Sequence, residues 1–153
     1  MAISKNIPRL VIAAPQGRSG KTTITLGLLS ALKKQGYRVQ PFKKGPDYID
    51  PSWLSAAAGR TCSNLDGFLL DDEDLSRSLL QATSDAHLAV VEGAMGFYDG
   101  MDLDGNGSTA EIAKKIEAPV LLVLDCQRMS RSAAAVVMGF QNFDPEVRIA
   151  GVI

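Results

Sequence analysis

The residues with the clearest chemistry form a glycine-rich segment that ends in lysine and threonine, residues 15–23. It follows the pattern G-x-x-x-x-G-K-[ST], whose backbone N–H groups bind a nucleotide phosphate, whose lysine reaches the β- and γ-phosphates and whose hydroxyl ligates Mg²⁺. Pro15 departs from the pattern, because a glycine is usual there. An incidental glycine turn is the alternative, but Gly-Lys-Thr opening a helix after a buried strand is the context that the motif requires. We therefore expect ATP and Mg²⁺ as cofactors, with the nucleotide bound by Gln16, Gly17, Arg18, Ser19, Gly20, Lys21, Thr22 and Thr23.

A carboxylate that could hold the metal ion is Glu92, which ends the apolar run 88–91 and precedes Gly93. Magnesium on a phosphate-binding loop usually has an acidic partner at the end of a neighbouring strand. Taken alone, Glu92 would be read as a solvated loop residue. Beside the loop at 15–23 the metal role is favoured, because ligands in open sheets gather at the carboxyl ends of the strands.

A third charged group lies in the segment 42–51, after the second predicted strand. Lys43 offers a cation for a transferred phosphate, and Asp47 and Asp50 offer carboxylates for a metal ion. By spacing alone the segment could equally be a turn built on residues 45–47, which are ordinary turn residues. Both interpretations stay open at this level.

Other candidate ligands carry weaker signals. The loop 99–107 resembles the first half of an EF-hand, but position twelve would be Ala113, where calcium requires a bidentate glutamate. We predict a flexible loop bordering the active site instead. His87, the only histidine, begins an apolar run and is interpreted as structural. Cys62 and Cys126 match no metal-binding spacing and are expected to be reduced thiols.

The elements that must position these residues follow from hydrophobic periodicity. Short apolar runs predict strands, and apolar residues at helical spacing predict helices between them. Strands that alternate with helices predict the α/β class, here a three-layer P-loop NTPase fold with a mostly parallel, doubly wound sheet. The predicted strands are 9–14, 37–42, 87–91, 119–124 and 147–153, and the predicted helices are 21–35, 75–82, 108–117 and 130–140.

Composition limits the function classes. The chain has 153 residues, 46% hydrophobic and 22% charged, which is typical of one soluble domain with one core. Its 16 Lys and Arg against 17 Asp and Glu provide no basic excess, so no nucleic acid partner is expected. The first apolar run, 10–14, is too short to cross a bilayer, so no membrane is expected and the predicted location is cytoplasmic. The sequence stops inside an apolar stretch, 150–153, so we expect a fragment truncated at its C-terminus.

Taken together, the motifs closely resemble cobyrinic acid a,c-diamide synthases. The resemblance implies that residues 1–153 are the ATP-binding synthetase domain, with a dethiobiotin-synthetase-like fold, and that a separate glutamine amidotransferase domain supplies ammonia. Neither Cys62 nor Cys126 matches the nucleophile of that second domain, so this chain is not expected to hydrolyse glutamine. The likeness is carried by residues 13–15, 17–23, 41–43, 45–51, 90–93, 95–96 and 98–100, and it continues through 108–114, 118–120, 131–135, 143–145 and 150–153.

The resemblance also implies roles for single residues. By matching position, Thr22, Asp47 and Glu92 look like magnesium ligands and Lys21 and Lys43 like phosphate contacts, while Asp50 and Asp99 look like residues close to the reacting carboxylate. Pro15 agrees with the family, whose members have Ala-Pro before the loop. Lys44 departs from it, because many relatives have an apolar residue there.

The implied reaction is ATP-dependent, glutamine-dependent amidation of the a and c carboxylates of cobyrinate through an acyl phosphate. Hydrogenobyrinate and a nickel tetrapyrrole stay open as substrates, and a homodimer is considered as a partner. A dethiobiotin-synthetase-like ligase is the nearest rival, which residues 42–51 and 98–100 disfavour. The other rival function is that of a ParA/MinD-like partner-regulated ATPase. Such proteins have a lysine early in the phosphate-binding loop, where this chain has Pro15 and Gln16.

Overall fold

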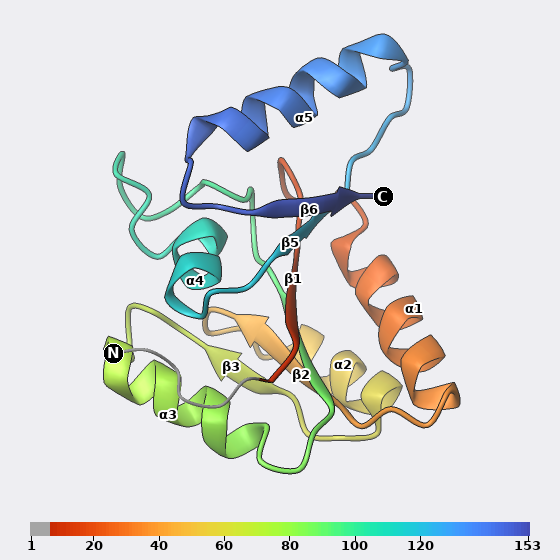
Figure 1. Ribbon diagram of the computed structural model, residues 1–153, viewed down its shortest axis with the longest axis vertical. Coiled ribbons are helices and arrows are strands. Elements are labelled where there is room, and N and C mark those ends of the chain that lie inside the picture. The colour runs from red at the N-terminus through yellow and green to blue at the C-terminus, as the bar shows by residue number, and fades with distance from the viewer. Residues whose placement is uncertain (1–6) are drawn as a thin grey trace.

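The protein forms one six-stranded parallel sheet covered by helices on both faces, as the computed structural model shows for the described residues, 7–153 (Figure 1). The strands lie in the order β3-β2-β4-β1-β5-β6, and each neighbouring pair is parallel. This confirms the predicted doubly wound α/β sheet. In chain order the elements are β1 (Arg9–Ala13), α1 (Lys21–Lys34), β2 (Val39–Lys44), α2 (Asp50–Ala58), β3 (Ser63–Leu65), α3 (Asp72–Ala82), β4 (Leu88–Glu92), α4 (Thr109–Lys115), β5 (Val120–Leu122), α5 (Arg131–Phe143) and β6 (Ile149–Val152).

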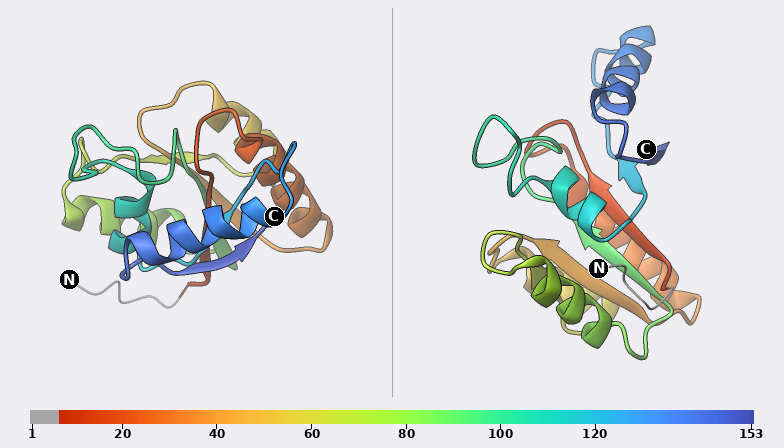
Figure 2. Two further views of the ribbon diagram at one scale, coloured as in Figure 1. Left: turned by 90° about the horizontal axis from the view of Figure 1, so that it is seen from above. Right: turned by 60° about the vertical axis from the view of Figure 1, so that its left-hand side comes forward.

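The central strand β1 is buried on both faces. Val11 and Ala13 belong to the core that also contains residues of α3 and α4, whereas Ile12 and Ala14 belong to the core under α1 and α2. A strand covered on both sides needs apolar residues at every position, which explains its unbroken apolar run. Figure 2 shows the helical layers on opposite sides of the sheet, with α5 beside the edge strand β6.

Strand register brings three connecting segments to one edge of the sheet. Ile12 of β1 and Lys43 of β2 both pair with Glu92 of β4. Because the strands are parallel, the segments that follow β1, β2 and β4 all leave the sheet at its carboxyl edge. This is the edge at which open α/β sheets bind ligands.

The second strand lies two residues later than the predicted range 37–42. Its first residues are used by the end of α1, because the Gly36 N–H donates to the Lys33 carbonyl and the Tyr37 N–H donates to the Leu32 carbonyl. The strand therefore runs on to Lys44. Lys43, which was expected after the strand, is a buried residue inside it.

Helix α2 and strand β3 were not predicted from the sequence. Helix α2 begins within the segment 42–51, for which no helix was predicted. Pro51 lies in its first turn, where the backbone N–H that proline lacks would have no partner within the helix. Strand β3 has only three residues, which is too short for a periodic signal. Its pairing with β2 is a long-range feature that no local pattern reveals.

His87 has the structural role that the sequence predicts. Its Nδ1 accepts a hydrogen bond from the Arg38 N–H at 3.2 Å, and its ring meets Tyr37 edge-on. This contact joins the start of β2 to the start of β4.

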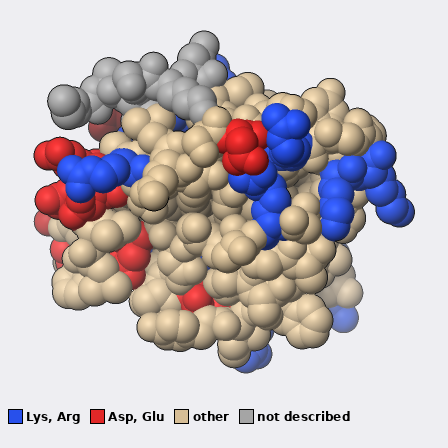
Figure 3. All heavy atoms as spheres, turned by 90° about the horizontal axis from the view of Figure 1, so that it is seen from below, with Lys and Arg blue, Asp and Glu red and all other residues tan. Residues whose placement is uncertain are grey.

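No helix within residues 7–153 is long and apolar enough to cross a membrane. On the face seen from below, basic and acidic side chains are interspersed among uncharged ones (Figure 3).

Candidate active site

The phosphate-binding loop joins β1 to α1 and has two residues with positive φ, Arg18 at +58° and Gly20. Gly20 has φ +85°, in the left-handed region that favours glycine, and α1 begins at the next residue. The Ser19 hydroxyl donates to the Gln16 carbonyl at 2.8 Å and closes the turn. The loop therefore ends at the N-terminus of α1, where free N–H groups and the helix dipole favour an anion.

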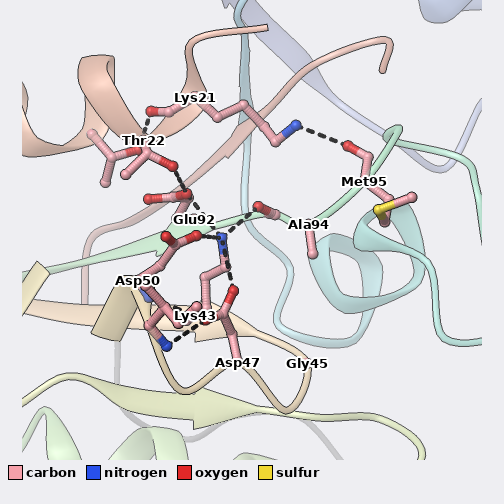
Figure 4. Close-up of polar contacts among 12 residues, drawn as sticks. Lys21, Thr22, Lys43, Gly45, Asp47, Asp50, Glu92, Ala94 and Met95 are labelled. Atoms are coloured by element: carbon pink, nitrogen blue, oxygen red, sulfur yellow. Dashed lines mark hydrogen bonds and ion pairs between the residues drawn. The ribbon is translucent and has the colours of Figure 1, made fainter. Parts of the chain in front are cut away.

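Lys21 is held between the two loops that follow β1 and β4. Its ammonium donates to the Gln16 carbonyl at 3.0 Å. It also donates to the Met95 carbonyl at 2.9 Å (Figure 4). Burial lowers the pKa of Lys21, and the positive charge of Lys43 lowers it further. A phosphate arriving at the loop would meet a lysine whose present partners are neutral carbonyls.

Glu92 is a fully buried carboxylate at the centre of the site. Its Oε1 accepts a hydrogen bond from the Thr22 hydroxyl at 2.6 Å and from the Lys43 ammonium at 2.9 Å. Its Oε2 is buried without a hydrogen-bond partner among the described residues. Buried polar atoms are seldom left unpaired, so this oxygen fits a metal ion or a metal-bound water.

Lys43 links Glu92 to the segment after β2. Its ammonium lies 2.6 Å from Asp50 Oδ2 and 3.8 Å from Asp47 Oδ2. Burial favours the neutral amine, but hydrogen bonds to Asp50 and Glu92 outweigh it and raise the pKa of Lys43. The lysine therefore remains charged within a ring of three carboxylates.

Asp47 forms a local turn and also lies near Lys43. Its Oδ1 accepts from the N–H groups of Ile49 and Asp50 at 2.8 and 3.0 Å, which closes a turn over residues 47–50. Within 45–47, the Asp47 N–H donates to the Gly45 carbonyl at 3.0 Å. Burial disfavours ionisation of Asp47, but these hydrogen bonds outweigh it and lower its pKa. The same turn places Asp47 and Asp50 beside the phosphate-binding loop.

A cavity of about 320 Å³ collects nearly all the predicted site residues. It is lined by Gly17 to Thr23, Lys43, Asp47, Asp50 and Glu92. Gln16 lies outside the lining but contributes the carbonyl that holds Lys21. Asp99 also lies outside it: the residue is exposed, and its carboxylate stands over Gly96.

Two lining residues, Ala94 and Met95, carried no predicted role. Met95 places its carbonyl on Lys21 from a left-handed backbone conformation, φ +56°. Every residue type has a backbone carbonyl, so such a contact cannot be predicted from the residue type. The one available signal was that Met95 belongs to the segments on which the family resemblance was based. A larger depression of about 600 Å³ beside the end of α4 contains none of the predicted site residues.

The donor set suits magnesium better than a metal held by protein alone. Within residues 7–153 no three His, Cys, Asp or Glu side chains are grouped to hold a metal ion by themselves. Magnesium in nucleotide sites commonly takes one or two protein ligands and completes its shell with phosphate oxygens and water. Thr22 and Glu92, with Asp47 further out, are compatible with that arrangement.

Comparison with known proteins shows relatives of the same kind along nearly the whole chain. Residues 10–153 match the family described as the CobQ/CobB/MinD/ParA nucleotide-binding domain. The chain is 51% identical over 147 residues to the cobyrinate a,c-diamide synthase of Syntrophotalea carbinolica, covering 95% of this chain and 32% of that protein. It is 48% identical to that of Methanosarcina barkeri, covering 97% of this chain and 31% of the relative. The chain thus spans about a third of the length of these relatives.

Solved structures agree with the fold at low sequence identity. The signal recognition particle receptor FtsY of Elizabethkingia anophelis, in complex with GDP, superposes with a TM-score of 0.66 at 17% identity, covering 97% of this chain and 49% of that one. The BceF tyrosine kinase domain has a TM-score of 0.67 at 16% identity, covering 95% of this chain and 67% of that one. At such identities the likeness supports the P-loop NTPase fold alone.

Proposed function

Because this chain belongs to the family of CobQ/CobB/MinD/ParA nucleotide-binding domains, we propose that residues 1–153 form the ATP-binding domain of a cobyrinate a,c-diamide synthase. In this proposal the domain binds ATP with Mg²⁺ and activates the a and c carboxylates of a cobyrinate-type corrinoid. Ammonia from glutamine, produced by a separate glutaminase domain, then completes the amide.

The proposed chemistry overcomes the poor reactivity of a carboxylate. Attack of the substrate carboxylate on the γ-phosphate of ATP forms an acyl phosphate and releases ADP. Ammonia then adds to the acyl carbon, and phosphate leaves. Catalysis of such a transfer consists mainly of positioning and of neutralising charge on the transferred group.

Each residue of the site has a part in this proposal. The N–H groups of residues 16–23 bind the phosphates, and Lys21 and Lys43 neutralise the transferred group. Thr22 and Glu92, with Asp47, would hold Mg²⁺, whose chemistry is to neutralise and orient the β- and γ-phosphates. Asp50 faces the same cavity and could orient the incoming substrate through Lys43.

One observation carries the proposal: two lysines, one hydroxyl and one fully buried carboxylate converge on one cavity from α1, β2 and β4. A site that only held the nucleotide would need the loop and Lys21. In the proposal the second cation, Lys43, neutralises the phosphate that is passed to the acceptor, and its place in the cavity lining supports that role. Similarity to the cobyrinate a,c-diamide synthases supports a corrinoid acid as that acceptor.

The cysteines agree with an external source of ammonia. Burial raises the pKa of Cys62 to about 12, so its thiol is protonated and unreactive at neutral pH. Cys126 is exposed, and the one histidine of the chain, His87, is engaged with Arg38 and Tyr37. No cysteine and histidine pair able to hydrolyse glutamine is therefore present in residues 7–153.

The test is ADP release by the purified chain with Mg·ATP, ammonia and a series of acids. Cobyrinate, hydrogenobyrinate and a nickel tetrapyrrole acid are compared with 7,8-diaminopelargonate plus bicarbonate, which a dethiobiotin-type ligase would use. We expect release to depend on the corrinoid acid and an amide to appear by mass spectrometry. Release that no tetrapyrrole acid stimulates would contradict the proposal and favour a ParA/MinD-like ATPase.

A further inference from the structure

The ammonium of Lys43 lies on the same carboxylate to which the proposed function assigns a metal ion. Lys43 and Glu92 are paired residues on the neighbouring strands β2 and β4, so the backbone holds them side by side. The lysine Nζ lies 2.9 Å from Glu92 Oε1 and 2.6 Å from Asp50 Oδ2. Its side chain is only 4% exposed.

We infer that Lys43 is a stand-in cation: it neutralises the carboxylates of the metal position in the nucleotide-free protein and moves onto phosphate when Mg²⁺ arrives with the nucleotide. The inference rests on the proposed function, which supplies the metal and the phosphate. Beyond that function, the inference states that the Lys43 ammonium and Mg²⁺ exchange at these carboxylates, and that this exchange controls metal binding.

The charge of the site requires a cation at all times. Asp47, Asp50 and Glu92 carry three negative charges, and Glu92 is fully buried. A buried carboxylate without a cation or sufficient hydrogen bonds is strongly unfavourable. Lys21 donates to two carbonyls, so among residues 7–153 the cation in contact with the three acids is Lys43.

The two cations compete for one carboxylate. Glu92 Oε1 already accepts from both Lys43 and Thr22, and the unpaired Oε2 is the atom left for a second cation. A divalent ion on Glu92 would lie close to the Lys43 ammonium, and like charges at such distances repel strongly in a buried site. Lys43 would therefore leave Glu92 when Mg²⁺ binds that carboxylate.

Lys43 can leave without moving its strand. Its flexible four-carbon side chain carries three donors that rotate freely. Asp50, its other close partner, is 27% exposed and lies on the cavity lining, so the ammonium has a path along that wall. The γ-phosphate gives the displaced ammonium a new anion, which couples metal binding to nucleotide binding.

The test measures metal binding without nucleotide. Mn²⁺, a paramagnetic substitute for Mg²⁺, is titrated into the wild type and into Lys43→Met, and free Mn²⁺ is measured by electron paramagnetic resonance. We expect Lys43→Met to bind Mn²⁺ at least about tenfold more tightly than the wild type, because the competing cation is gone. The gain should vanish in Lys43→Met with Glu92→Gln, and Lys34→Met, at the exposed end of α1, should behave as the wild type.

Equal Mn²⁺ affinity in Lys43→Met and the wild type would overturn the inference. Circular dichroism verifies that the variant is folded. A second measurement uses the wild type alone and needs no variant. In the ¹⁵N-labelled wild type, the Lys43 ammonium resonance should shift when Mg²⁺ and a non-hydrolysable ATP analogue saturate the site. An unchanged resonance at saturation would overturn the inference as well.

These outcomes separate the inference from the function on which it rests. If the wild type binds Mg·ATP and Lys43→Met shows no gain in Mn²⁺ affinity, the stand-in role fails while the proposed function survives. If the wild type does not bind Mg·ATP and the variant still gains Mn²⁺ affinity, the proposed function fails while the cation exchange within the carboxylates stands.

Discussion

At the scale of single residues, the site is organised by where each lysine finds its acceptors. Lys21 is satisfied by neutral carbonyls of Gln16 and Met95, whereas Lys43 is satisfied by carboxylates. Carbonyls hold a cation less strongly than carboxylates do, because ionised partners make the stronger hydrogen bonds. A phosphate can therefore recruit Lys21 at once but must compete for Lys43.

The first prediction concerns Lys21. Lys21→Ala should reduce ADP release by about a hundredfold or more, the effect of removing one positioned electrostatic contact in a buried site. Lys34→Ala, at the other end of the same helix, should have no effect. The two variants are compared by coupled ADP assay and by binding of a fluorescent ATP analogue. A Lys21→Ala protein with near-normal binding and turnover would remove this residue from the site.

At the scale of elements, two contacts join segments that lie far apart in the sequence. The loop after β4 approaches the phosphate-binding loop closely: a Cβ at Gly96 would meet the Asp99 carboxylate and would lie 2.7 Å from the Pro15 carbonyl. At the other edge of the sheet, Arg60 donates to both Asp85 oxygens and to Gln40, which joins the end of α2 to the start of β4.

The second prediction tests the close approach at Gly96. Gly96→Ala should lower the free energy of unfolding by about 1–3 kcal/mol, as overpacking does, and should weaken ATP binding roughly tenfold because it displaces a positioned loop. Urea denaturation and nucleotide titration measure the two effects. Gly139→Ala is the matched control, since its added Cβ meets no atom within 4 Å. This control should stabilise α5 by roughly 0.5–1 kcal/mol. Similar behaviour of the two variants would contradict the prediction.

The third prediction concerns the pH dependence that Asp85 confers. Hydrogen bonds from Arg60 lower the pKa of Asp85 to about 2. A carboxyl whose pKa is depressed in the folded state contributes stability above its unfolded pKa of about 3.9, and this is lost as the pH falls through the folded value. The free energy of unfolding should therefore fall less steeply from pH ~4 to ~2 in Asp85→Asn than in the wild type. Asp104→Asn, in an exposed loop, serves as the control for removing a charge, and an unaltered slope in Asp85→Asn would exclude this linkage.

At the scale of the whole molecule, nucleotide and metal binding should appear as stability. A ligand at about 100 times its dissociation constant stabilises a protein by about 2.7 kcal/mol, which is roughly 5–10 °C in Tm for a domain of this size. We expect Mg·ATP to raise Tm by this amount and ATP with EDTA to raise it much less. Differential scanning fluorimetry measures both. An equal rise with and without EDTA would argue against a metal on Thr22 and Glu92.

Local patterns in the sequence determined the phosphate-binding loop, most of the helices and strands, and the parallel α/β class. A glycine turn between a buried strand and a helix is readable within a few residues, and each strand shows its burial as an apolar run. The same patterns misplaced the start of β2 and missed α2 and β3, where the end of a helix, a proline at a helix start and a three-residue strand leave weak local signals.

Only the tertiary structure decided how the charged residues meet. The register of β2 against β4 places Lys43 beside Glu92, and the turn after β2 brings Asp50 to the same ammonium. The loop after β4 also places Asp99 over Gly96 and outside the cavity that most of the other predicted residues line. Such contacts join residues far apart in the chain, and they depend on strand pairing and loop packing, which no short stretch of sequence specifies.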